Sequence, residues 1–264
     1  MTNDAPNRPE VDHYGSQYGN FESELLSSIR REAFGDDYGQ NGWQSADEQD
    51  LFIESLTIEA RSRVLDVACG SGGPALRIAD RTACSIVGVD LHEQGVATAQ
   101  RAAVSRGLAS RAEFRRADAS RALPFDDGAF DALICIDAIN HLDDRARVLA
   151  EFRRVLKPGG RLLYSDPVVV TGCVAAEEFR IRSSIGAFFY YPRGENERLL
   201  EAAGFELLAV QDRTENLATT AQRWLDARSA RAAELRTLEG AANFDGQQVF
   251  FECAARLARE RRLS

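Results

Sequence analysis

A short apolar segment that ends in a run of glycines is the clearest chemical signal in the sequence. Residues 64–68 read Val-Leu-Asp-Val-Ala, the turn at 70–73 reads Gly-Ser-Gly-Gly, and a helix is expected from Pro74. Glycines let a backbone approach a ligand closely, and a helix N-terminus offers it free N–H groups. Asp90 ends the next apolar segment, where a carboxylate can bind both hydroxyls of a ribose. This spacing predicts a cradle for a nucleotide-containing cofactor.

Two cofactors fit this cradle when only the glycines are considered. The turn satisfies the dinucleotide fingerprint G-x-G-x-x-G/A, with Asp90 about 20 residues further on, which leaves NAD open. Asp66 instead favours S-adenosylmethionine, because a carboxylate that faces the cradle suits a cationic amino-acid group and repels a pyrophosphate. Asp118 follows the third apolar segment and is positioned to accept a hydrogen bond from an adenine amino group.

Three motifs in a fixed order make the sequence resemble the class I S-adenosylmethionine-dependent methyltransferases. They are Asp-Val-Ala-Cys-Gly-Ser-Gly-Gly at 66–73, Pro-Phe-Asp-Asp-Gly-Ala-Phe-Asp at 124–131 and Leu-Lys-Pro-Gly-Gly-Arg-Leu at 156–162. The resemblance covers about residues 58 to 210. It is strongest to the small-molecule branch, with the ubiquinone/menaquinone C-methyltransferases and the phosphoethanolamine N-methyltransferases. The stretch 37–43 also resembles the lid that closes over the cofactor in that branch.

The resemblance implies a role for each residue of the cradle. It implies cofactor contacts at strand ends, namely Asp66, Ala68, Gly70 and Gly72 at the methionine end, Asp90 on the ribose, Leu91 on the adenine face, Asp118 and Ala119 at the adenine edge, and Ile136 and Asp137 facing the methionyl group. The alternative for Asp90 and Asp118 is that each carboxylate only caps the helix that follows it. The implied activity is in-line methyl transfer to a nitrogen, oxygen or carbon nucleophile of a small molecule, which leaves S-adenosylhomocysteine.

His141 is the candidate general base for an acceptor that must lose a proton. It follows the fourth apolar segment, at the carboxyl edge where open α/β sheets bind ligands. An unperturbed imidazole is mostly neutral at pH 7 and can accept a proton there. The alternative is that His141 caps the helix expected from Asp143 or packs beneath the cofactor. His92, next to the end of the second segment, is expected to be a solvated surface residue.

The acceptor is expected between the lid and residues 167–193. Aromatic residues approach this space from two sides, with Tyr38 and Trp43 on the lid and Phe188, Phe189, Tyr190 and Tyr191 opposite, of which Phe189 and Tyr190 are the selected substrate contacts. Such rings can hold a cationic amine or stack on a phenol. Core packing is the alternative for at least two of the four. Arg180 and Arg182 can pair with a substrate carboxylate or phosphate, but a solvated helix face is favoured for both.

The elements that must position these residues alternate between strand and helix. Strands are expected at 64–68, 85–89, 112–117, 130–136, 161–165 and 206–210, and helices at 19–34, from 45, 74–80, 93–106, 143–156, 195–203 and, after about 217, as two helices, the second at 245–262. Strands that are apolar on both faces and alternate with helices predict a Rossmann-like, mostly parallel sheet with helices on both faces. The expected domains are a lid at 1–57, whose residues 1–18 form a mobile arm, and a methyltransferase domain at 58–264 with a helical insertion at 167–193.

Composition limits the remaining function classes. The 41 acidic and 32 basic residues give a net charge of −9, which disfavours nucleic acid as a partner. The five cysteines are widely spaced and the three histidines are scattered, so we expect free thiols and no metal site. No apolar run approaches the ~18 residues of a membrane span, and the N-terminus lacks the apolar core of a signal peptide, so a cytoplasmic location is expected.

Three alternatives to a small-molecule methyltransferase stay open at this point. An NAD-dependent oxidoreductase would explain the glycine pattern, but gives no reason for Asp66 or for the motif at 156–162. An RNA or protein methyltransferase shares the cradle, although the negative charge disfavours RNA. A binding protein could keep the cradle without turnover. A seventh strand, usual in the family, is absent from the pattern, and the strand edge left open favours either a homodimer or a truncated chain.

Overall fold

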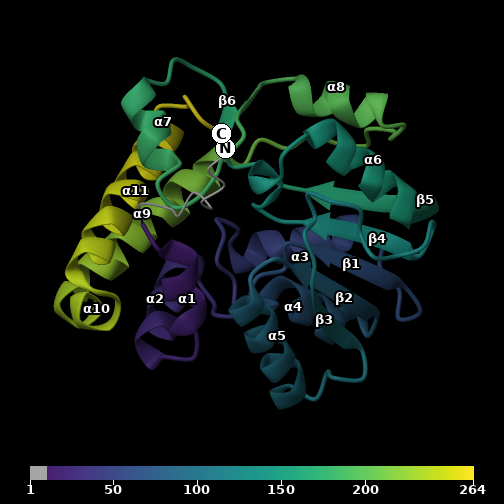
Figure 1. Cartoon of the computed structure of the whole chain (residues 1–264), viewed down its shortest axis with the longest axis horizontal. Helices are drawn as coiled ribbons and strands as arrows, with labels where there is room; N and C mark the ends of the chain where they lie inside the picture. Colours follow the sequence, from purple (N-terminus) through teal and green to yellow (C-terminus); the bar gives the residue numbers. More distant parts are fainter. Residues whose placement is uncertain (1–10) are drawn as a thin grey trace, which may run out of the picture.

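The computed structural model describes residues 11–264. A central sheet of five parallel strands has the order β3-β2-β1-β4-β5. The strands are β1 (Arg63–Val67), β2 (Ser85–Asp90), β3 (Ala112–Arg116), β4 (Phe130–Cys135) and β5 (Leu156–Tyr164). Figure 1 shows this sheet on the right-hand side of the molecule and a group of helices on the left.

Helices from the alternating part of the chain cover both faces of the sheet. One face packs against α3 (Ala46–Ser55), α4 (Gly73–Thr82) and α5 (Glu93–Ser105), and the other against α6 (Arg145–Val155) and α8 (Glu195–Ala202). Successive residues of β1 belong to opposite layers, because Val64 packs in the first and Leu65 in the second. The predicted Rossmann-like α/β class is confirmed. The carboxyl ends of all strands meet at one edge of the sheet, where ligands of such folds bind.

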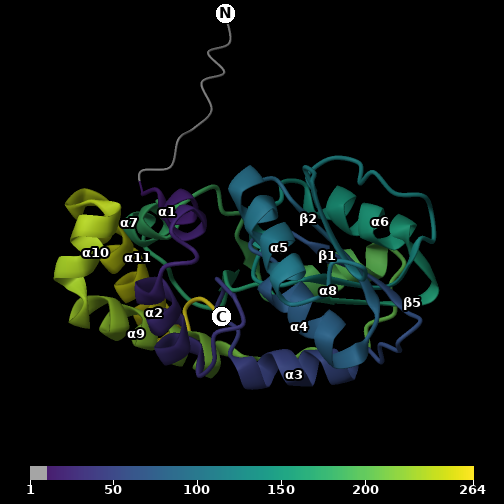
Figure 2. The same cartoon turned by 90° about the horizontal axis from the view of Figure 1, so that it is seen from below.

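The remaining helices form a separate layer beside that edge. They are α1 (His13–Gly19), α2 (Glu24–Phe34), α7 (Ala176–Arg182), α9 (Thr214–Ala230), α10 (Ala232–Glu239) and α11 (Ala241–Arg259), and Figures 1 and 2 show them grouped together. Their shared core includes Leu26, Ile29, Trp224, Phe250 and Phe251. Two helices were expected after about 217, whereas three are present, because Gly240 ends α10 and starts α11. The insertion at 167–193 contains α7 and two short strands, β6 (Val169–Val170) and β7 (Tyr191–Pro192).

The predicted sixth strand at 206–210 is wrong. This segment has no regular structure, and Leu207, Leu208 and Val210 are exposed. A groove of about 910 Å³ is lined by the segment on one side and by β5 on the other. An apolar, β-prone run forms a strand only when its backbone can pair with a neighbouring strand. Here the groove separates the segment from the outer edge of β5. β5 also begins five residues earlier than predicted, with a register shift opposite Phe130 to Ala132.

The predicted mobile arm at 1–18 is wrong for the residues that can be compared, since residues 1–10 lie outside the described part. His13–Gly19 forms α1, capped by Asp12, whose side chain accepts a hydrogen bond from the amide of Gly15. His13 and Tyr18 are buried. Residues 19–34 were expected to be helical with Phe21, Leu25 and Ile29 on one face. Instead Ser23 caps α2 and its buried stripe runs along Leu26, Ile29 and Ala33, so of the three expected residues only Ile29 is fully buried. By contrast, the expected cap at Ser45 is confirmed, with a capping box to Glu48.

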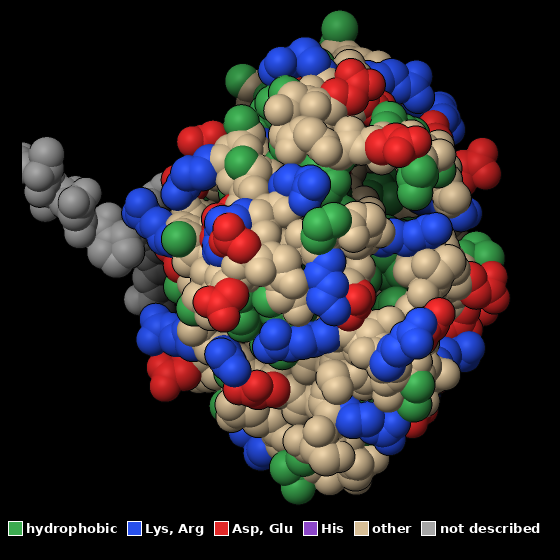
Figure 3. Space-filling model, turned by 90° about the vertical axis from the view of Figure 1, so that its right-hand side faces the viewer, with side chains coloured by type: hydrophobic (Ala, Val, Ile, Leu, Met, Phe, Trp, Pro, Cys, Tyr) green, Lys and Arg blue, Asp and Glu red, His purple; other side chains and the backbone are tan. Residues whose placement is uncertain are grey.

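Acidic and basic side chains alternate over the right-hand side of the molecule. Figure 3 shows this face with blue and red groups interspersed rather than gathered into one field. Within residues 11–264, no helix combines the length and the apolar character that a membrane crossing requires.

Candidate functional site

The turn between β1 and α4 depends on glycines. Gly72 caps α4 with a φ of +78°, and a Cβ at this position would lie 2.7 Å from the Cβ of Ala99. Gly70 also has a positive φ, of +53°. Side chains rarely tolerate this left-handed backbone, whereas glycine adopts it freely. The turn therefore brings the free N–H groups at the start of α4 to the edge of the sheet, where they form a cradle for a polar ligand.

Asp66 lies buried at the end of β1 with one carboxylate oxygen unpaired. Its Oδ2 makes no hydrogen bond within the described part of the chain. Burial raises the pKa of Asp66 well above its ordinary value, and the nearby charge of Asp90 raises it further. A buried carboxyl group without a partner is costly unless a ligand satisfies it. Asp66 is therefore suited to a cationic group in the cradle.

Asp90 connects the glycine turn to the start of α5. Its Oδ2 accepts a hydrogen bond from the amide of Gly70 at 2.8 Å, and its Oδ1 accepts one from the amide of His92 at 2.7 Å. The alternative role for Asp90, a cap on α5, is absent, because the N-cap of α5 is His92 and no side chain caps this helix; Asp90 instead braces the turn before it. A carboxylate has about four acceptor positions, so both oxygens can still accept from a ligand. Leu91, expected on the adenine face, is exposed beside it.

The ends of β3 and β4 carry the other expected cofactor contacts. Asp118 lies just beyond β3, where its Oδ1 accepts a hydrogen bond from the amide of Ser120 at 2.9 Å, and Ala119 is buried. The amide of Ala117 donates to the carbonyl of Asp90 at 3.0 Å, which holds these two strand ends together. Ile136 follows β4 and packs against the core layer beside α4. All of these residues lie at the same edge of the sheet as the glycine turn.

The lid loop, which we define as residues 37–43, lies directly over the glycine turn. The hydroxyl of Ser71 donates to the carbonyl of Gly39 at 3.0 Å. A Cβ on Gly73 would lie 2.3 Å from the carbonyl carbon of Gly39, so the two backbones are nearly in contact. The ring of Tyr38 is buried, with the guanidinium of Arg77 4.8 Å from its centroid. The lid loop therefore closes the outer side of the cradle.

Trp43, at the end of the lid loop, connects the cradle to the helical layer. Its amide donates to Oδ2 of Asp137 at 2.6 Å, while the hydroxyl of Ser165 donates to Oδ1 of the same carboxylate at 2.6 Å. Its ring stacks on Phe250 of α11, with the ring centroids 6.1 Å apart. The carboxylate of Asp137 thus holds the lid, in addition to the contact with the methionyl group that we expected from it.

Two residues at neighbouring strand ends have a strained backbone. Ala68, after β1, has a φ of +58°, and Asp137, after β4, has a φ of +52°. Non-glycine residues rarely adopt such angles, because the angles cost conformational free energy. A folded protein keeps them only where the surrounding structure imposes them. Strained positions of this kind gather at ligand sites. Both residues are among the expected cofactor contacts.

His141 is partly buried and forms a hydrogen-bonded pair with Tyr14 of α1. Nδ1 of His141 lies 2.8 Å from the carbonyl oxygen of Ala187, which can only accept, so Nδ1 carries the proton. Nε2 is therefore the acceptor, and the hydroxyl of Tyr14 donates to it at 2.8 Å. Burial lowers the pKa of His141 to about 4, and the charge of Arg182 lowers it as well. The imidazole is neutral at physiological pH, as a proton acceptor requires.

Tyr18, one turn after Tyr14, closes the cradle from the side of α1. Its ring meets that of His92 edge to face at 4.8 Å, and a Cβ on Gly70 would lie 2.7 Å from its hydroxyl. The prediction that His92 is a solvated surface residue is wrong, because Tyr18 packs against its ring and its Nδ1 is buried. A helix that contacts both the cradle and His141 can couple cofactor binding to the acceptor site.

The aromatic run at 188–191 divides between the site and the core. Phe188 lies edge to face against His141, with the centroids 4.4 Å apart. Phe189 is partly exposed, and its amide donates to the carbonyl of Asn140 at 2.8 Å. Tyr190 packs against Phe179, and its hydroxyl lies 3.1 Å from that of Ser183. Tyr191 lies under Arg145, on the side of the core. Phe188 is thus the member of the run that reaches the histidine.

The two arginines of α7 have different surroundings. Arg180 is exposed and pairs with Glu177 at 2.8 Å, as a solvated helix face predicts. Arg182 is buried, so the same prediction is wrong for it. α7 packs against α11, and residue 182 faces this contact, whereas residue 180 faces outward.

Sequence reasoning missed Tyr14 and Tyr18. Their signal is present, since tyrosines four residues apart lie on one face of a helix, but it stands in a stretch rich in glycine and polar residues. Only the fold brings this stretch next to His141. The contact joins residues separated by 127 positions, which no local pattern reveals.

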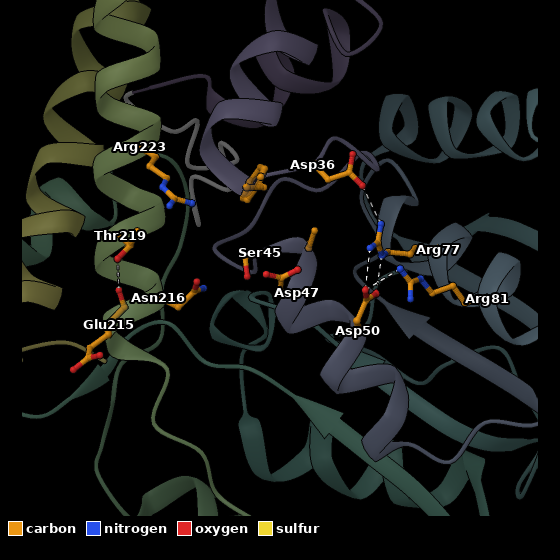
Figure 4. Close-up of a pocket in the computed structure, with 13 residues that line it drawn as sticks. Asp36, Ser45, Asp47, Asp50, Arg77, Arg81, Glu215, Asn216, Thr219 and Arg223 are labelled. Carbon is orange, nitrogen blue, oxygen red and sulfur yellow. Dashed lines mark hydrogen bonds and ion pairs between the residues drawn. The ribbon is translucent and has the colours of Figure 1, made fainter.

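A second, polar pocket of about 620 Å³ lies between α2, α3, α4 and α9, away from the strand ends. Figure 4 shows its basic wall, where Arg77 and Arg81 both reach Asp50, while Thr219 and Asn216 stand opposite. On this wall Arg77 pairs with Asp36 and Asp50, and Arg81 pairs with Asp50, so these four charges neutralise one another. Within residues 11–264, no group of three or more His, Cys, Asp or Glu side chains is placed to hold a metal ion.

Comparisons with known proteins agree on one family. The model of the methyltransferase domain matches residues 65–164, which run from β1 to the end of β5. Methyltransferase GfsG of Streptomyces halstedii is 35% identical over 176 residues, which cover 63% of this chain and 61% of that protein. O-methyltransferase rstn1 of Aspergillus nomiae is 32% identical over 160 residues, which cover 60% of this chain and 71% of that protein. The chain spans about three fifths of the length of the first curated relatives that it matches.

Among solved structures, the [4+2]-cyclase SpnF has a TM-score of 0.72 and 28% sequence identity, with 92% of each chain covered. The fold is therefore shared over almost the whole chain, including the helical layer. The alternative of a dinucleotide-dependent oxidoreductase finds no support among these relatives.

Proposed function

The chain belongs to the class I S-adenosylmethionine-dependent methyltransferases, and from this membership we propose that it transfers a methyl group to a small-molecule acceptor. The observation that carries the proposal is the combination of the unpaired carboxyl group of Asp66 in the cradle with the Tyr14–His141 pair beside it. One group suits the cationic end of the cofactor and the other accepts a proton from the acceptor. A dinucleotide would leave both without a role.

The residues of the cradle fit S-adenosylmethionine. The unpaired Oδ2 of Asp66 suits the amino group of the methionine end, and the glycine turn leaves no space for side chains where a ligand must approach. Asp90 would hold the ribose and Asp118 the adenine edge, with Leu91 covering the ring. Bound there, the cofactor supplies an activated methyl group on a sulfonium. In-line attack then needs little from the protein beyond positioning, which can supply roughly 7–11 kcal/mol of the barrier.

Tyr14 and His141 would move the proton of an N–H or O–H acceptor. The acceptor gives its proton to the phenol oxygen of Tyr14 while the Tyr14 proton passes to Nε2 of His141, so that the charge ends on the imidazolium. The carbonyl of Ala187 keeps Nδ1 protonated and thereby directs Nε2 toward Tyr14. Phe188 fixes the plane of the imidazole by edge-to-face contact. A carbon acceptor that loses its proton later could use the same pair.

The lid loop and α1 would exclude water during transfer. The contacts of Gly39 with Ser71 and of Trp43 with Asp137 hold the loop over the cradle, so a ligand can enter only after they break. Tyr38, Trp43, Phe189 and Tyr190 remain the proposed substrate contacts, to which we add Phe188.

A second candidate function is cyclisation without methyl transfer. It is favoured by the similarity to the [4+2]-cyclase SpnF, which at 28% identity covers 92% of each chain. A site that positions two reacting groups would serve such a reaction as well. The two functions differ in one product, since only methyl transfer forms S-adenosylhomocysteine.

We also propose that the protein works in a reducing compartment such as the cytoplasm and has no nucleic-acid partner. Four of the five cysteines are buried free thiols, and the net charge is −9. The open edge of β5 supports the proposal of a homodimer, because an unpaired strand edge is usually covered.

Thermal unfolding with S-adenosylmethionine, S-adenosylhomocysteine and NADH tests the cofactor. At 100 times the dissociation constant a ligand adds about 2.7 kcal/mol, which for a chain of this size is a shift of roughly 5–10 °C. We expect a shift with both sulfur ligands and none with NADH. A shift with NADH alone would overturn the proposal. Formation of S-adenosylhomocysteine during a screen of amines, phenols and carboxylates then separates methyl transfer from cyclisation.

A further inference from the structure

Arg182 is a buried cation without an anionic partner. The residue is 1% exposed, and its Nε and Nη1 make no hydrogen bond within residues 11–264. Burial lowers the pKa of Arg182, and the groups that oppose this, Tyr190, Cys253 and Tyr14, are all neutral at pH 7. A guanidinium cannot lose its proton under these conditions, so the charge remains inside the protein. Burying an unpaired charge is among the most costly arrangements in a folded chain.

The other deeply buried arginines of the described part show that this is an exception. Arg145 donates to the carboxylate of Asp166 at 2.5 Å, and Arg30 donates to that of Asp37 at 2.8 Å. Arg228 is paired with Glu239. The fold thus supplies a carboxylate to each buried guanidinium except that of Arg182. A purely structural arginine would be expected to have one too.

Aromatic rings surround Arg182 instead of carboxylates. Its guanidinium carbon lies 4.5 Å from the ring centroid of Phe250 and 5.5 Å from those of Trp43 and Phe188. Ring faces attract the positive charge and keep water away. They do not accept the in-plane N–H donors in the way that an oxygen does, and unsatisfied buried donors cost free energy. The rings therefore leave the donors of the guanidinium available to a ligand.

Two of these rings also border the proposed acceptor site. Phe188 contacts the imidazole of His141 on one side and Arg182 on the other. Trp43 belongs to the lid loop, and its amide is bound to Asp137 at the end of β4. Arg182 is thus separated from the Tyr14–His141 pair by a single ring.

We propose that Arg182 binds an oxyanion of the methyl acceptor, a carboxylate or a phosphate monoester, and so selects anionic substrates. The inference rests on the proposed function, since it places the nucleophile of the acceptor at Tyr14 and its anionic group beyond Phe188. Arginine presents paired donors that match both kinds of oxyanion. A cationic amine without an anionic group is disfavoured, because the positive charge of Arg182 would repel it.

Calorimetric titration of the full chain tests this with three probes of similar shape. Benzoate and phenyl phosphate carry the two candidate oxyanions, and benzyl alcohol carries none. We expect the preferred anion to bind at least tenfold more tightly than benzyl alcohol. Comparing benzoate with phenyl phosphate identifies which oxyanion is selected. Equal affinity for all three probes would overturn the proposal.

Two variants locate the effect. Arg182→Met should lose the preference for the anion while keeping its affinity for S-adenosylhomocysteine, and Arg180→Met, on the exposed side of the same helix, should keep both. Arg182→Lys retains the positive charge but lacks the paired N–H donors of a guanidinium, so its preference for the anion should be weaker. If Arg182→Met keeps the full preference, or if Arg182→Met and Arg182→Lys both fail to fold, the role is structural and the proposal is wrong.

Each titration is run with and without S-adenosylhomocysteine. A protein that does not bind S-adenosylhomocysteine contradicts the proposed function, while the anion titrations still decide the role of Arg182. A protein that binds the cofactor product and shows no anion preference contradicts only the role of Arg182.

Discussion

The hydroxyl of Tyr14 lies 2.8 Å from Nε2 of His141, although 127 residues separate the two in the chain. The tautomer of the imidazole follows from its other hydrogen bond, because the carbonyl of Ala187 can only accept. Tyr14 comes from the N-terminal helix, and His141 follows a strand of the sheet. The pair therefore exists only when α1 is docked, which links proton transfer to closure of the site.

Replacing either member of this pair should lower turnover. A positioned base contributes about 10²–10⁴-fold, so we expect His141→Gln to reduce kcat at least 100-fold with an O–H or N–H acceptor, and Tyr14→Phe to reduce it as well. Steady-state kinetics with the first acceptor from the screen measures this. Because the pKa of His141 is lowered to about 4, kcat of the unaltered protein should not fall between pH 8 and pH 6 through this group. Unchanged turnover in His141→Gln would show that proximity alone carries the reaction.

Cofactor binding should release a proton from Asp66. Burial and Asp90 raise the pKa of this carboxyl group, and a bound ammonium group would lower it again. Titration of S-adenosylhomocysteine in buffers with different ionisation enthalpies measures the protons released at pH 7. Asp66→Asn should abolish this release and weaken binding at least tenfold, which is about 1.4 kcal/mol. Identical heats in all buffers together with unchanged affinity of Asp66→Asn would contradict the assignment.

A methyl group at Gly73 should displace the lid loop. The added Cβ would lie 2.3 Å from the backbone of Gly39, and backbone atoms cannot rotate away as a side chain does. Overpacking costs typically 1–3 kcal/mol, so Gly73→Ala should fold with a lowered Tm. Hydrogen exchange of residues 37–43 should become faster in this variant. Gly19→Ala is the control, because the nearest atom to its added Cβ is 3.9 Å away. Equal exchange in both variants would mean that the lid contact is unimportant.

The sequence predicted the cradle well because its elements are local. The strand, the glycine turn and the acid at the end of β2 are defined by apolar runs and turn residues within about 30 positions. The acceptor side depends instead on contacts between distant segments. α1 docks through Tyr14 and Tyr18, and Arg182 is buried only because α7 packs on α11. The strand expected at 206–210 failed for the same reason, since its pattern says nothing about the groove beside β5.

Protonation of His13 should weaken the fold as the pH falls. His13 is buried on α1, its Nδ1 bonds to Oε1 of Gln247 at 2.9 Å, and burial lowers its pKa from 6.5 to about 4. Above pH 6.5 the folded and unfolded chains are both neutral at this position, so it contributes no pH dependence. Between pH 6.5 and about 4 only the unfolded chain takes up the proton, and stability is lost.

The loss from this one residue between pH 7 and pH 5 should be about 2 kcal/mol. Buried carboxyl groups such as that of Glu48, whose pKa is raised to about 7, act in the opposite direction, so a difference measurement is needed. Urea unfolding of the unaltered protein and of His13→Asn at both pH values provides it. The variant should lose about 2 kcal/mol less than the unaltered protein on acidification. An equal loss in the two proteins would show that His13 is not the group that titrates.

Two buried arginines should respond in opposite ways to the same substitution. Arg145 is paired with Asp166 at 2.5 Å and also donates to Oδ1 of Asn196. Arg145→Met leaves the carboxylate of Asp166 buried and without its cation, which typically costs about 3–5 kcal/mol. Arg182→Met leaves no charge behind, because no carboxylate faces Arg182 within residues 11–264. It removes the cost of an unpaired cation and keeps most of the side-chain volume against Phe250, so stability should be unchanged or increased.

Urea unfolding of the two variants, without cofactor or acceptor, measures this contrast. If Arg182→Met loses as much stability as Arg145→Met, then the rings alone stabilise the guanidinium and Arg182 belongs to the core. If Arg182→Met is as stable as the unaltered protein, the guanidinium contributes nothing to the free energy of folding. The free-energy cost of burying its charge must then be offset by another role of Arg182. Binding of an oxyanion is the function that would offset it, since a ligand recovers the free energy that the empty site leaves unsatisfied.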